Sequence, residues 1–331
     1  MEQVMTRRPP KFIPDYLTPM PSHLLATLLT DLTTGTAPRP RPSSPAVQTP
    51  PPPLPQGHHL VYFPIQTPPS GLAADGADGD HEPPPQGGLR RRRLWAGGEL
   101  VFRDGWRQGL RLDGRPWACS EALERVRRVP AGQGDKVFVD VWRRYGLGHE
   151  REREGWDVEE RRTLVFMPIP DLKPAASCSS SSPSKTCESQ PPPTRRFVKY
   201  PHPPSLSVPI RPPTPAHLFH FSALTLNAHA IHLDPRYAAA TDGHRALLVH
   251  GPLALALMLR VLAAACSDSS DHGRAEGIVR RLTYRNYAPL YVGEPMTVCA
   301  RRLAAPCMWD VWVEGPGGAL AVKGTAEVEA E

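Results

Sequence analysis

Residues 247–266 read LLVHGPLALALMLRVLAAAC, the most hydrophobic stretch of the chain, and four segments of strand character follow it. These segments are RLTYRNY (281–287), MTVCARRL (296–303), MWDVWVEG (308–315) and ALAVKGTAEVE (319–329), with GPGG (315–318) as a hairpin signal between the last two. A long apolar helix followed by an antiparallel meander predicts an α+β arrangement, in which a sheet wraps around a central helix.

The same stretch has the length to span a bilayer. It contains His250, Pro252 and Arg260, which a spanning helix would tolerate badly. We therefore expect a buried core helix from Pro252 to about Ala265, and no transmembrane segment.

The first part of the chain has a similar order of elements. An amphipathic helix is expected from Ser22, with Leu24, Leu25, Leu28, Leu29 and Leu32 on one face. Strand patterns follow at ELVF (99–102), ALERVRRV (122–129), KVFVDVWRRY (136–145) and TLVFMPI (163–169), and the charged HEREREGWDVEERR (149–162) is interpreted as an exposed connection. The two halves are therefore expected to be copies of one unit, although their sequences are not visibly alike.

Composition shifts predict the domain boundaries. The expected segments are 1–36 with the helix of the first unit, 37–88 as a Pro/Gly-rich insertion, 89–169 as the strands of the first unit, 170–199 as a Pro/Ser-rich linker and 200–331 as the second unit.

The overall composition narrows the classes of partner. The chain has 331 residues, 42 prolines, a net charge of +6 and a pI of about 9.1. Much of the positive charge lies in local runs such as Arg90–Arg93 without interleaved aromatic residues, so we expect a solvated surface and no nucleic-acid partner. The six cysteines show no CxxC spacing, which favours reduced thiols in an intracellular compartment.

The segment FSALTLNAHAIHLD (221–234) concentrates groups that can move protons. His229 and His232 lie three residues apart, with Asn227 just before them, and histidine is the side chain whose ordinary pKa lies nearest neutrality. A His-x-x-His pair is also a metal-ligand pair, but the other histidines follow no familiar ligand spacing, so no metal is expected. Histidines satisfied by backbone hydrogen bonds in a loop are the remaining alternative.

The pair Gly251-Pro252 opens the apolar helix. Proline suits the first turn, glycine allows close approach to the backbone, and a helix start offers unpaired N–H donors. Such donors can stabilise the enolate oxygen of a thioester.

These residues carry a resemblance to a known family. FSALTLNAHAIHLDPRYA followed by LLVHGPLALALML resembles the hydratase segment of MaoC-like enzymes of the hotdog fold, whose signature is G-D-x-N-P-I-H followed by H-G. The similarity to its fungal and mitochondrial branch, the 3-hydroxyacyl-thioester dehydratases type 2 (mesaconyl-C4-CoA hydratase-like), extends to HHLVYFPIQTP, RRLWAGGELVF and YRNYAPLYVGEPMTVCARR.

The resemblance implies a double hotdog, that is, a pseudo-dimer in one chain with a non-catalytic first half and a catalytic second half. It places the family's histidine on His232, its aspartate on Asn227 and its asparagine on His229; Leu226 and Ala230 depart from the family's glycine and proline. It also implies that Gly251 N–H polarises the thioester carbonyl, and that Trp95, His250 and Phe221 contact the substrate. No cofactor is implied.

The implied activity is reversible dehydration of (R)-3-hydroxyacyl thioesters to trans-2-enoyl thioesters, carried by acyl carrier protein or coenzyme A. One alternative is a hydratase of a dicarboxylic thioester such as mesaconyl- or itaconyl-CoA. Another is a hotdog protein that binds acyl thioesters without catalysis. The branch suggests a mitochondrial location, with a cytoplasmic one as the alternative, and association of the pseudo-dimer into a homo-oligomer is a further expectation.

Overall fold

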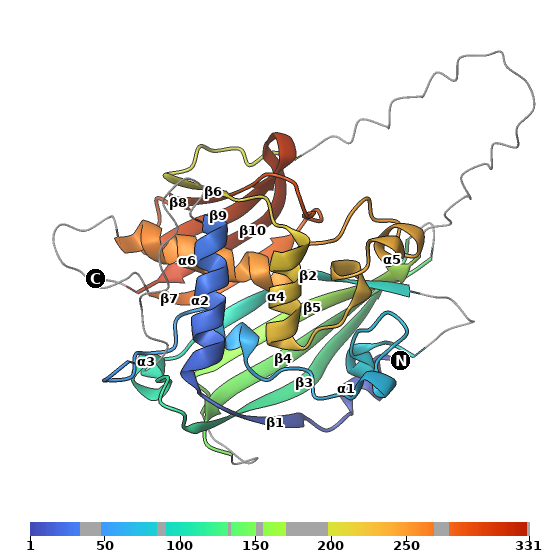
Figure 1. Ribbon diagram of the computed structural model, residues 1–331, viewed down its shortest axis with the longest axis horizontal. Coiled ribbons are helices and arrows are strands. Elements are labelled where there is room, and N and C mark those ends of the chain that lie inside the picture. The colour runs from blue at the N-terminus through green and yellow to red at the C-terminus, as the bar shows by residue number, and fades with distance from the viewer. Residues whose placement is uncertain are drawn as a thin grey trace, which may run out of the picture.

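The computed structural model describes residues 1–33, 48–84, 91–131, 134–149, 155–169, 198–267 and 278–329. The strands of these residues form one ten-stranded antiparallel sheet in the order β1-β3-β4-β5-β2-β7-β10-β9-β8-β6 (Figure 1). The strands are β1 Lys11–Tyr16, β2 Arg91–Phe102, β3 Pro116–Val129, β4 Lys136–Leu147, β5 Val158–Pro168, β6 Leu206–Ile210, β7 Val279–Asn286, β8 Met296–Arg302, β9 Met308–Gly315 and β10 Ala319–Val328. The helices are α1 Glu2–Thr6, α2 Pro19–Thr33, α3 Trp106–Gly109, α4 Pro215–Thr225, α5 Pro235–Ala240 and α6 Gly251–Ser267, with 3-10 turns η1 His58–Val61, η2 Pro69–Gly71, η3 Gly79–His81, η4 Ala230–His232 and η5 Pro316–Gly318.

The two halves of the sheet repeat one topology. From the outer edge to the centre, the first half runs β1-β3-β4-β5-β2 and the second runs β6-β8-β9-β10-β7, so each strand has a counterpart five strands later. The halves join where β2 pairs with β7, between Gly97–Val101 and Arg281–Arg285. This order supports the expectation of two copies of one unit, and the α+β double hotdog is confirmed.

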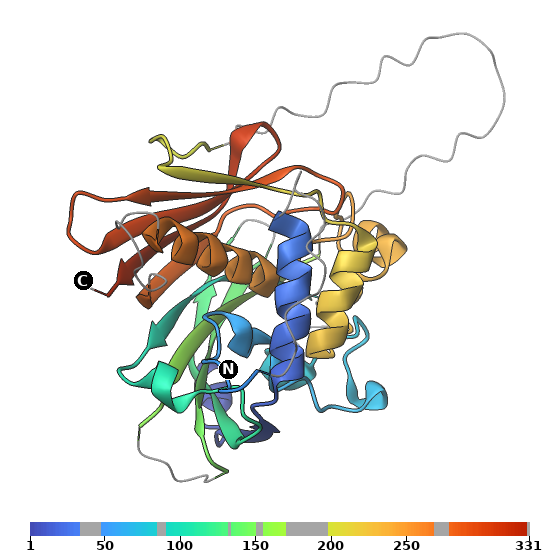
Figure 2. The same ribbon diagram turned by 60° about the vertical axis from the view of Figure 1, so that its left-hand side comes forward.

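The long central helix belongs to the second half. α6 packs against β7, β8 and β9 (Figure 2) and, as expected for a buried core helix, its side chains from Leu253 to Leu259 are all buried. α2 instead packs against α4, η1 and β6, and it follows β1 as α4 follows β6. Among the described residues between α2 and β2, the turn η1 packs against α6.

Several local predictions differ from the structure. α2 begins at Pro19, three residues before the expected start; Ser22 therefore lies inside the helix, where its hydroxyl bonds His58 Nδ1 at 2.7 Å, and Leu24 is exposed. Residues 158–162, assigned to an exposed connection, form the start of β5, because their charges are paired inside the sheet. The GPGG hairpin between β9 and β10 is confirmed.

Across the described ranges, no helix is long and apolar enough to cross a membrane. Of the two expected linkers, 37–88 is described from 48 to 84, while 170–199 falls outside the described residues except for its last two positions.

Candidate active site

A cavity of about 490 Å³ runs between the two halves, and its walls include all seven residues that the sequence singled out. The second half contributes Phe221, Asn227, His229, His232, His250 and Gly251, and the first half contributes Trp95. The structure therefore brings the two sequence motifs and the distant tryptophan to one place.

Residues 221–234, which the sequence predicts to be catalytic, are here called the catalytic segment, and their local fold explains how the histidines reach the cavity. α4 ends at Thr225, and the next residue, Leu226, has a left-handed φ of 48° and turns the chain out of the helix. Asn227 Oδ1 then accepts a hydrogen bond from the His229 N–H at 3.2 Å, an Asx turn that fixes the next residues. The turn η4 follows and presents His232.

His232 is held in one tautomer. Its Nδ1 lies 2.8 Å from the carbonyl oxygen of Leu248, and a carbonyl oxygen can only accept, so Nδ1 carries the proton and Nε2 keeps its lone pair. Burial lowers the pKa of His232 to about 4; the Leu248 hydrogen bond opposes this and His244 adds to it. His232 is therefore neutral at pH 7, with Nε2 as a base.

His250 fixes the plane of the His232 ring. The two imidazoles stack with their centroids 3.7 Å apart and an interplanar angle of 21°. His250 Nε2 lies 2.9 Å from the Ser222 hydroxyl, and Phe221 contacts the His250 ring at a centroid distance of 4.9 Å. Burial, with His232 and His229, lowers the pKa of His250 well below its ordinary value, so the stacked pair carries no charge repulsion at neutral pH.

His229 stands edge-on to His232, with the ring centroids 5.6 Å apart. Its Nε2 lies 3.4 Å from Asp75 Oδ2, a carboxylate that sequence reasoning missed because it lies in the Pro/Gly-rich insertion. Burial lowers the pKa of His229 well below its ordinary value, and His232, Arg93 and His244 lower it further. His229 is thus neutral as well.

The start of α6 forms another part of the cavity wall. Gly251 is the first residue of the helix, so its N–H has no acceptor within the helix. A Cβ on Gly251 would lie 3.1 Å from both Cβ and Cγ of Trp95, which explains the glycine: the backbone and the indole are in direct contact. Trp95 is held in turn by its Nε1–H, which donates to the Tyr284 hydroxyl at 2.9 Å.

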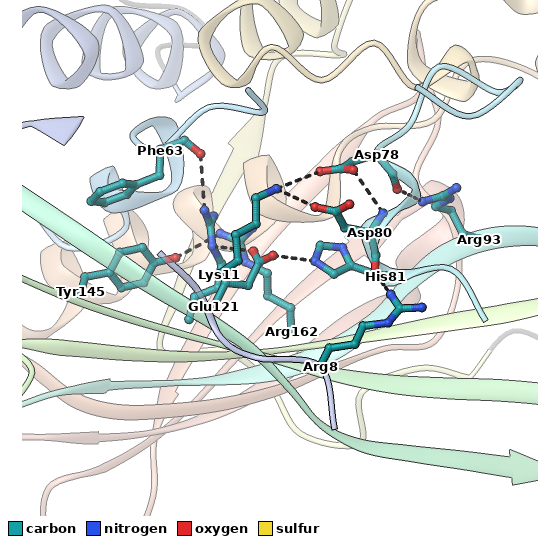
Figure 3. A network of polar contacts seen from close by, with 11 residues as sticks. Arg8, Lys11, Phe63, Asp78, Asp80, His81, Arg93, Glu121, Tyr145 and Arg162 are labelled. Atoms are coloured by element: carbon teal, nitrogen blue, oxygen red, sulfur yellow. Dashed lines mark hydrogen bonds and ion pairs between the residues drawn. The ribbon is translucent and has the colours of Figure 1, made fainter. Parts of the chain in front are cut away.

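Buried ion pairs line the part of the cavity inside the first half (Figure 3). Arg143 Nε lies 3.1 Å from Glu121 Oε2, and His81 Nε2 lies 2.8 Å from the other oxygen of Glu121. Arg162 Nη2 lies 2.7 Å from Glu160 Oε2. Arg143 and Arg162 are part of the cavity wall, but each already has a carboxylate partner.

The arginine run expected to be a solvated surface makes contacts within the protein at Arg92 and Arg93, and Arg93 also lines the cavity. Arg92 donates to the Asp242 carbonyl oxygen at 2.5 Å, and Arg93 lies 3.3 Å from Asp75. Arg90 lies outside the described residues. Within the part of the chain that the structure covers, no group of three or more histidine, cysteine or acidic side chains is arranged to hold a metal ion.

Comparison with known proteins places the chain in a family. Residues 57–292 match the model of the hydroxyacyl-thioester dehydratase type 2 family. The chain is 29% identical over 282 residues to the mesaconyl-C(4)-CoA hydratase of Chloroflexus aurantiacus, covering 83% of this chain and 84% of that protein. It is 24% identical over 268 residues to the mitochondrial hydroxyacyl-thioester dehydratase type 2 of Schizosaccharomyces pombe, covering 74% and 77%.

Solved structures agree on the fold. A MaoC-like dehydratase from Phytophthora capsici superposes with a TM-score of 0.59 at 11% identity, covering 99% of this chain and 98% of that one. HtdX from Mycobacterium tuberculosis gives a TM-score of 0.53 at 13% identity, covering 96% and 99%.

Proposed function

Because the chain belongs to the hydroxyacyl-thioester dehydratase type 2 family, we propose that it is a hydro-lyase that interconverts (R)-3-hydroxyacyl and trans-2-enoyl thioesters. The observation that carries the proposal is the single tautomer of His232, whose Nδ1–H is fixed by Leu248 and whose Nε2 lone pair is left to the cavity. A buried neutral imidazole of fixed orientation is suited to take up a proton and return it.

The chemistry assigns one task to each residue. The thioester carbonyl accepts a hydrogen bond from Gly251 N–H, which stabilises the enolate oxygen as negative charge develops there. In hydration, His232 Nε2 takes a proton from water while the water oxygen bonds to C3, and the same proton then passes to C2. Dehydration reverses these steps: His232 removes the C2 proton and returns it to the departing 3-hydroxyl.

Asn227 and His229 hold the water or the 3-hydroxyl. The oxygen of Asn227 is engaged by the His229 N–H, so its amide NH₂ is the group that can donate to the substrate oxygen. An amide cannot take a proton, which leaves acid/base work to the imidazoles. Trp95, His250 and Phe221 shape the wall around them.

A hydration assay tests the proposal. Crotonyl-CoA and a longer trans-2-enoyl-CoA are mixed with the wild type and with His232→Ala, and the loss of enoyl absorbance is followed. We expect turnover by the wild type and a loss of at least about 10²-fold in the variant. Binding of the enoyl thioester by folded wild-type protein with no absorbance change would refute the proposal in favour of a non-catalytic binding protein.

The second candidate is hydration of a dicarboxylic enoyl-CoA such as mesaconyl-CoA. Two observations favour it: the bacterial relative named for that activity, and the guanidinium groups of Arg143 and Arg162 in the cavity wall. Their pairing with Glu121 and Glu160 weighs against it, since a substrate carboxylate would have to compete with a buried glutamate. The ratio of kcat/KM for mesaconyl-CoA and crotonyl-CoA decides between the two.

The proposal also covers the carrier of the acyl group, the subcellular location of the protein and its oligomeric state. Acyl carrier protein and coenzyme A both present the same thioester to the site. The relative from Schizosaccharomyces pombe is named as mitochondrial, which supports a mitochondrial location for this chain, and import of the tagged chain into isolated mitochondria would test it. Association of the pseudo-dimer into a homo-oligomer stays a prediction, which the molar mass measured by light scattering would test.

A further inference from the structure

Residues 73–81, here called the strap, cross from the first half of the molecule onto the catalytic segment. The carbonyl oxygen of Asp75 accepts a hydrogen bond from the Ala230 N–H at 2.7 Å, one residue after His229. Gly76 has a φ of +77°, and a Cβ there would lie 2.2 Å from the carbonyl oxygen of Ala228. The strap backbone is therefore seated directly on both sides of His229.

The other end of the strap is fixed to the first half (Figure 3). Arg93 donates to the Asp78 carbonyl oxygen at 2.5 Å, Lys11 Nζ lies 2.6 Å from Asp80 Oδ2, and His81 pairs with Glu121 at 2.8 Å. Exposed pairs such as Lys11–Asp80 are each worth about 0–1 kcal/mol, but three contacts within four residues define one position for the strap.

The Asp75 carboxylate is oriented by this arrangement. Its Oδ1 accepts a hydrogen bond from the Ala77 N–H at 3.0 Å. Its Oδ2 lies 3.4 Å from His229 Nε2 and 3.3 Å from Arg93 Nε. His229 Nε2 is buried and has no hydrogen-bond partner in the described part of the chain, so its 3.4 Å approach to Asp75 is an ion-pair contact that falls short of hydrogen-bond geometry. Catalytic contacts of this length commonly tighten when substrate binds.

The catalytic segment has no carboxylate of its own at this place. Asn227 stands where the resemblance to MaoC-like enzymes implies an aspartate, and its oxygen is used by the His229 N–H. Asp234, the next acid along the chain, accepts from Arg236 and Tyr237 N–H at the start of α5. Asp75 therefore fills a chemical gap in the segment.

We propose that Asp75 is a positioning residue of the active site, which supplies from the first half the carboxylate that the catalytic segment lacks. It accepts the Nε2–H of His229 and so holds that ring in the tautomer whose Nδ1 lone pair can bind a proton of the water or of the 3-hydroxyl. No proton is transferred to Asp75; the proton that moves between water and C2 travels on His232. This role rests on the hydro-lyase function proposed above.

The charges around His229 determine in which direction the loss of Asp75 changes the pKa of His229. Asp75 favours the protonated imidazole, whereas burial, His232, Arg93 and His244 disfavour it, and together these lower the pKa of His229. Removing the Asp75 charge takes away an anion beside the imidazole while Arg93, which also pairs with Glu82 at 3.4 Å, keeps its positive charge, so the pKa of His229 falls further.

The test compares Asp75→Asn with Asp80→Asn, which removes another strap carboxylate that does not contact a catalytic histidine. We expect Asp75→Asn to lower kcat about 10²-fold with little change in KM, and Asp80→Asn to stay within about threefold of the wild type, as loss of an exposed ion pair would give. Equal losses in the two variants, or full activity of Asp75→Asn, would overturn the proposal.

Nitrogen-15 NMR of the histidine side chains provides a readout that does not depend on turnover. Wild-type His229 should be protonated at Nε2 at pH 7, and Asp75→Asn should shift it toward the Nδ1–H form while Asp80→Asn does not. If the wild type hydrates no thioester, the proposed function fails but the tautomer measurement still decides the role of Asp75. An unchanged His229 tautomer in Asp75→Asn refutes it.

Discussion

Replacement of Gly76 by alanine tests whether the strap governs the catalytic segment. The new Cβ would lie 2.2 Å from the carbonyl oxygen of Ala228, more than 1 Å inside ordinary van der Waals contact, and that carbonyl precedes His229. Because both partners are backbone, the clash cannot be relieved by rotating a side chain. Either the strap lifts off or the segment carrying Asn227 and His229 shifts.

The cost follows from three contributions. A left-handed φ of +77° costs an alanine about 1–2 kcal/mol. Overpacking typically adds about 1–3 kcal/mol, and the reduced entropy of the unfolded chain returns about 0.4–1 kcal/mol. If the strap stays seated, we expect a net destabilisation of about 1–5 kcal/mol. If it lifts off, the free energy of unfolding changes less but His229 loses Asp75.

The assay is urea unfolding together with kcat for enoyl-CoA hydration. Gly79→Ala is the matched control, because that glycine lies in the same strap with no atom within 4 Å of its added Cβ. Whether the strap lifts off or the catalytic segment shifts, we expect the kcat of Gly76→Ala to be at least about 10-fold below that of Gly79→Ala. A displacement near 1 Å at a catalytic group can cost about 10²-fold in rate. Wild-type stability and kcat in Gly76→Ala would show that the strap is not seated on the catalytic segment.

Three further predictions concern His232 and the buried ion pairs. Burial lowers the pKa of His232 to about 4, so kcat/KM for hydration should stay level from pH 8 to pH 5 and fall only as the imidazole is protonated near pH 4; an acid limb near pH 6.5 would contradict this. The pKa of His232 is lower in the folded protein than in the unfolded chain. Its contribution to stability is therefore complete above about pH 6.5 and is lost as the pH falls toward 4. Urea unfolding at several pH values should show this as a lower free energy of unfolding in acid. Arg162→Met should cost about 3–5 kcal/mol because it leaves the buried Glu160 carboxylate without its arginine. Arg162→Met combined with Glu160→Gln should recover part of that loss, and equal stability of the single and double variants would refute the pairing.

The elements that the sequence predicted well are those whose pattern is local. The apolar helix α6 and strands β7 to β10 follow from continuous hydrophobicity, alternation and the GPGG turn. The two strands missed, β1 and β6, each contain a proline, Pro14 and Pro209. Proline in a strand argues against a central position, and both strands are indeed the outer edges of the sheet. The two prolines are therefore consistent with edge positions in the sheet, although they kept β1 and β6 from being predicted as strands.

Charge pairing caused the clearest error in the first half. The run from Val158 to Arg162 has the composition of a solvated connection, yet Glu160 is completely buried in β5. It is satisfied by Arg162 two residues later and by the Tyr145 hydroxyl at 2.5 Å on the adjacent strand β4. A burial pattern that depends on partners across strands cannot be read from one strand alone.

The same limit applies to the active site. Asn227, His229, His232 and Gly251 lie within one stretch of chain, so their spacing and the resemblance sufficed to gather them. Asp75 belongs to a segment whose Gly-, Asp- and Pro-rich composition predicts only an extended loop. Its partner Arg93 lies in a run of arginines that looks like a solvated surface. The contact of both with the catalytic segment is a consequence of how the two halves join.

The unequal halves explain how a repeated fold encloses a substrate cavity. In the second half, α6 fills the concave side of the sheet with buried apolar side chains. In the first half, the element that meets α6 is the single turn η1, which is too short to fill the same space. The cavity extends into this region, where Leu60, Phe63, Val141 and Leu164 line it beside the buried ion pairs. The short turn η1 thus leaves the volume in which the proposed function places the acyl chain, while the long helix α6 presents its N-terminus, at Gly251, to the position that the proposed mechanism gives to the thioester carbonyl.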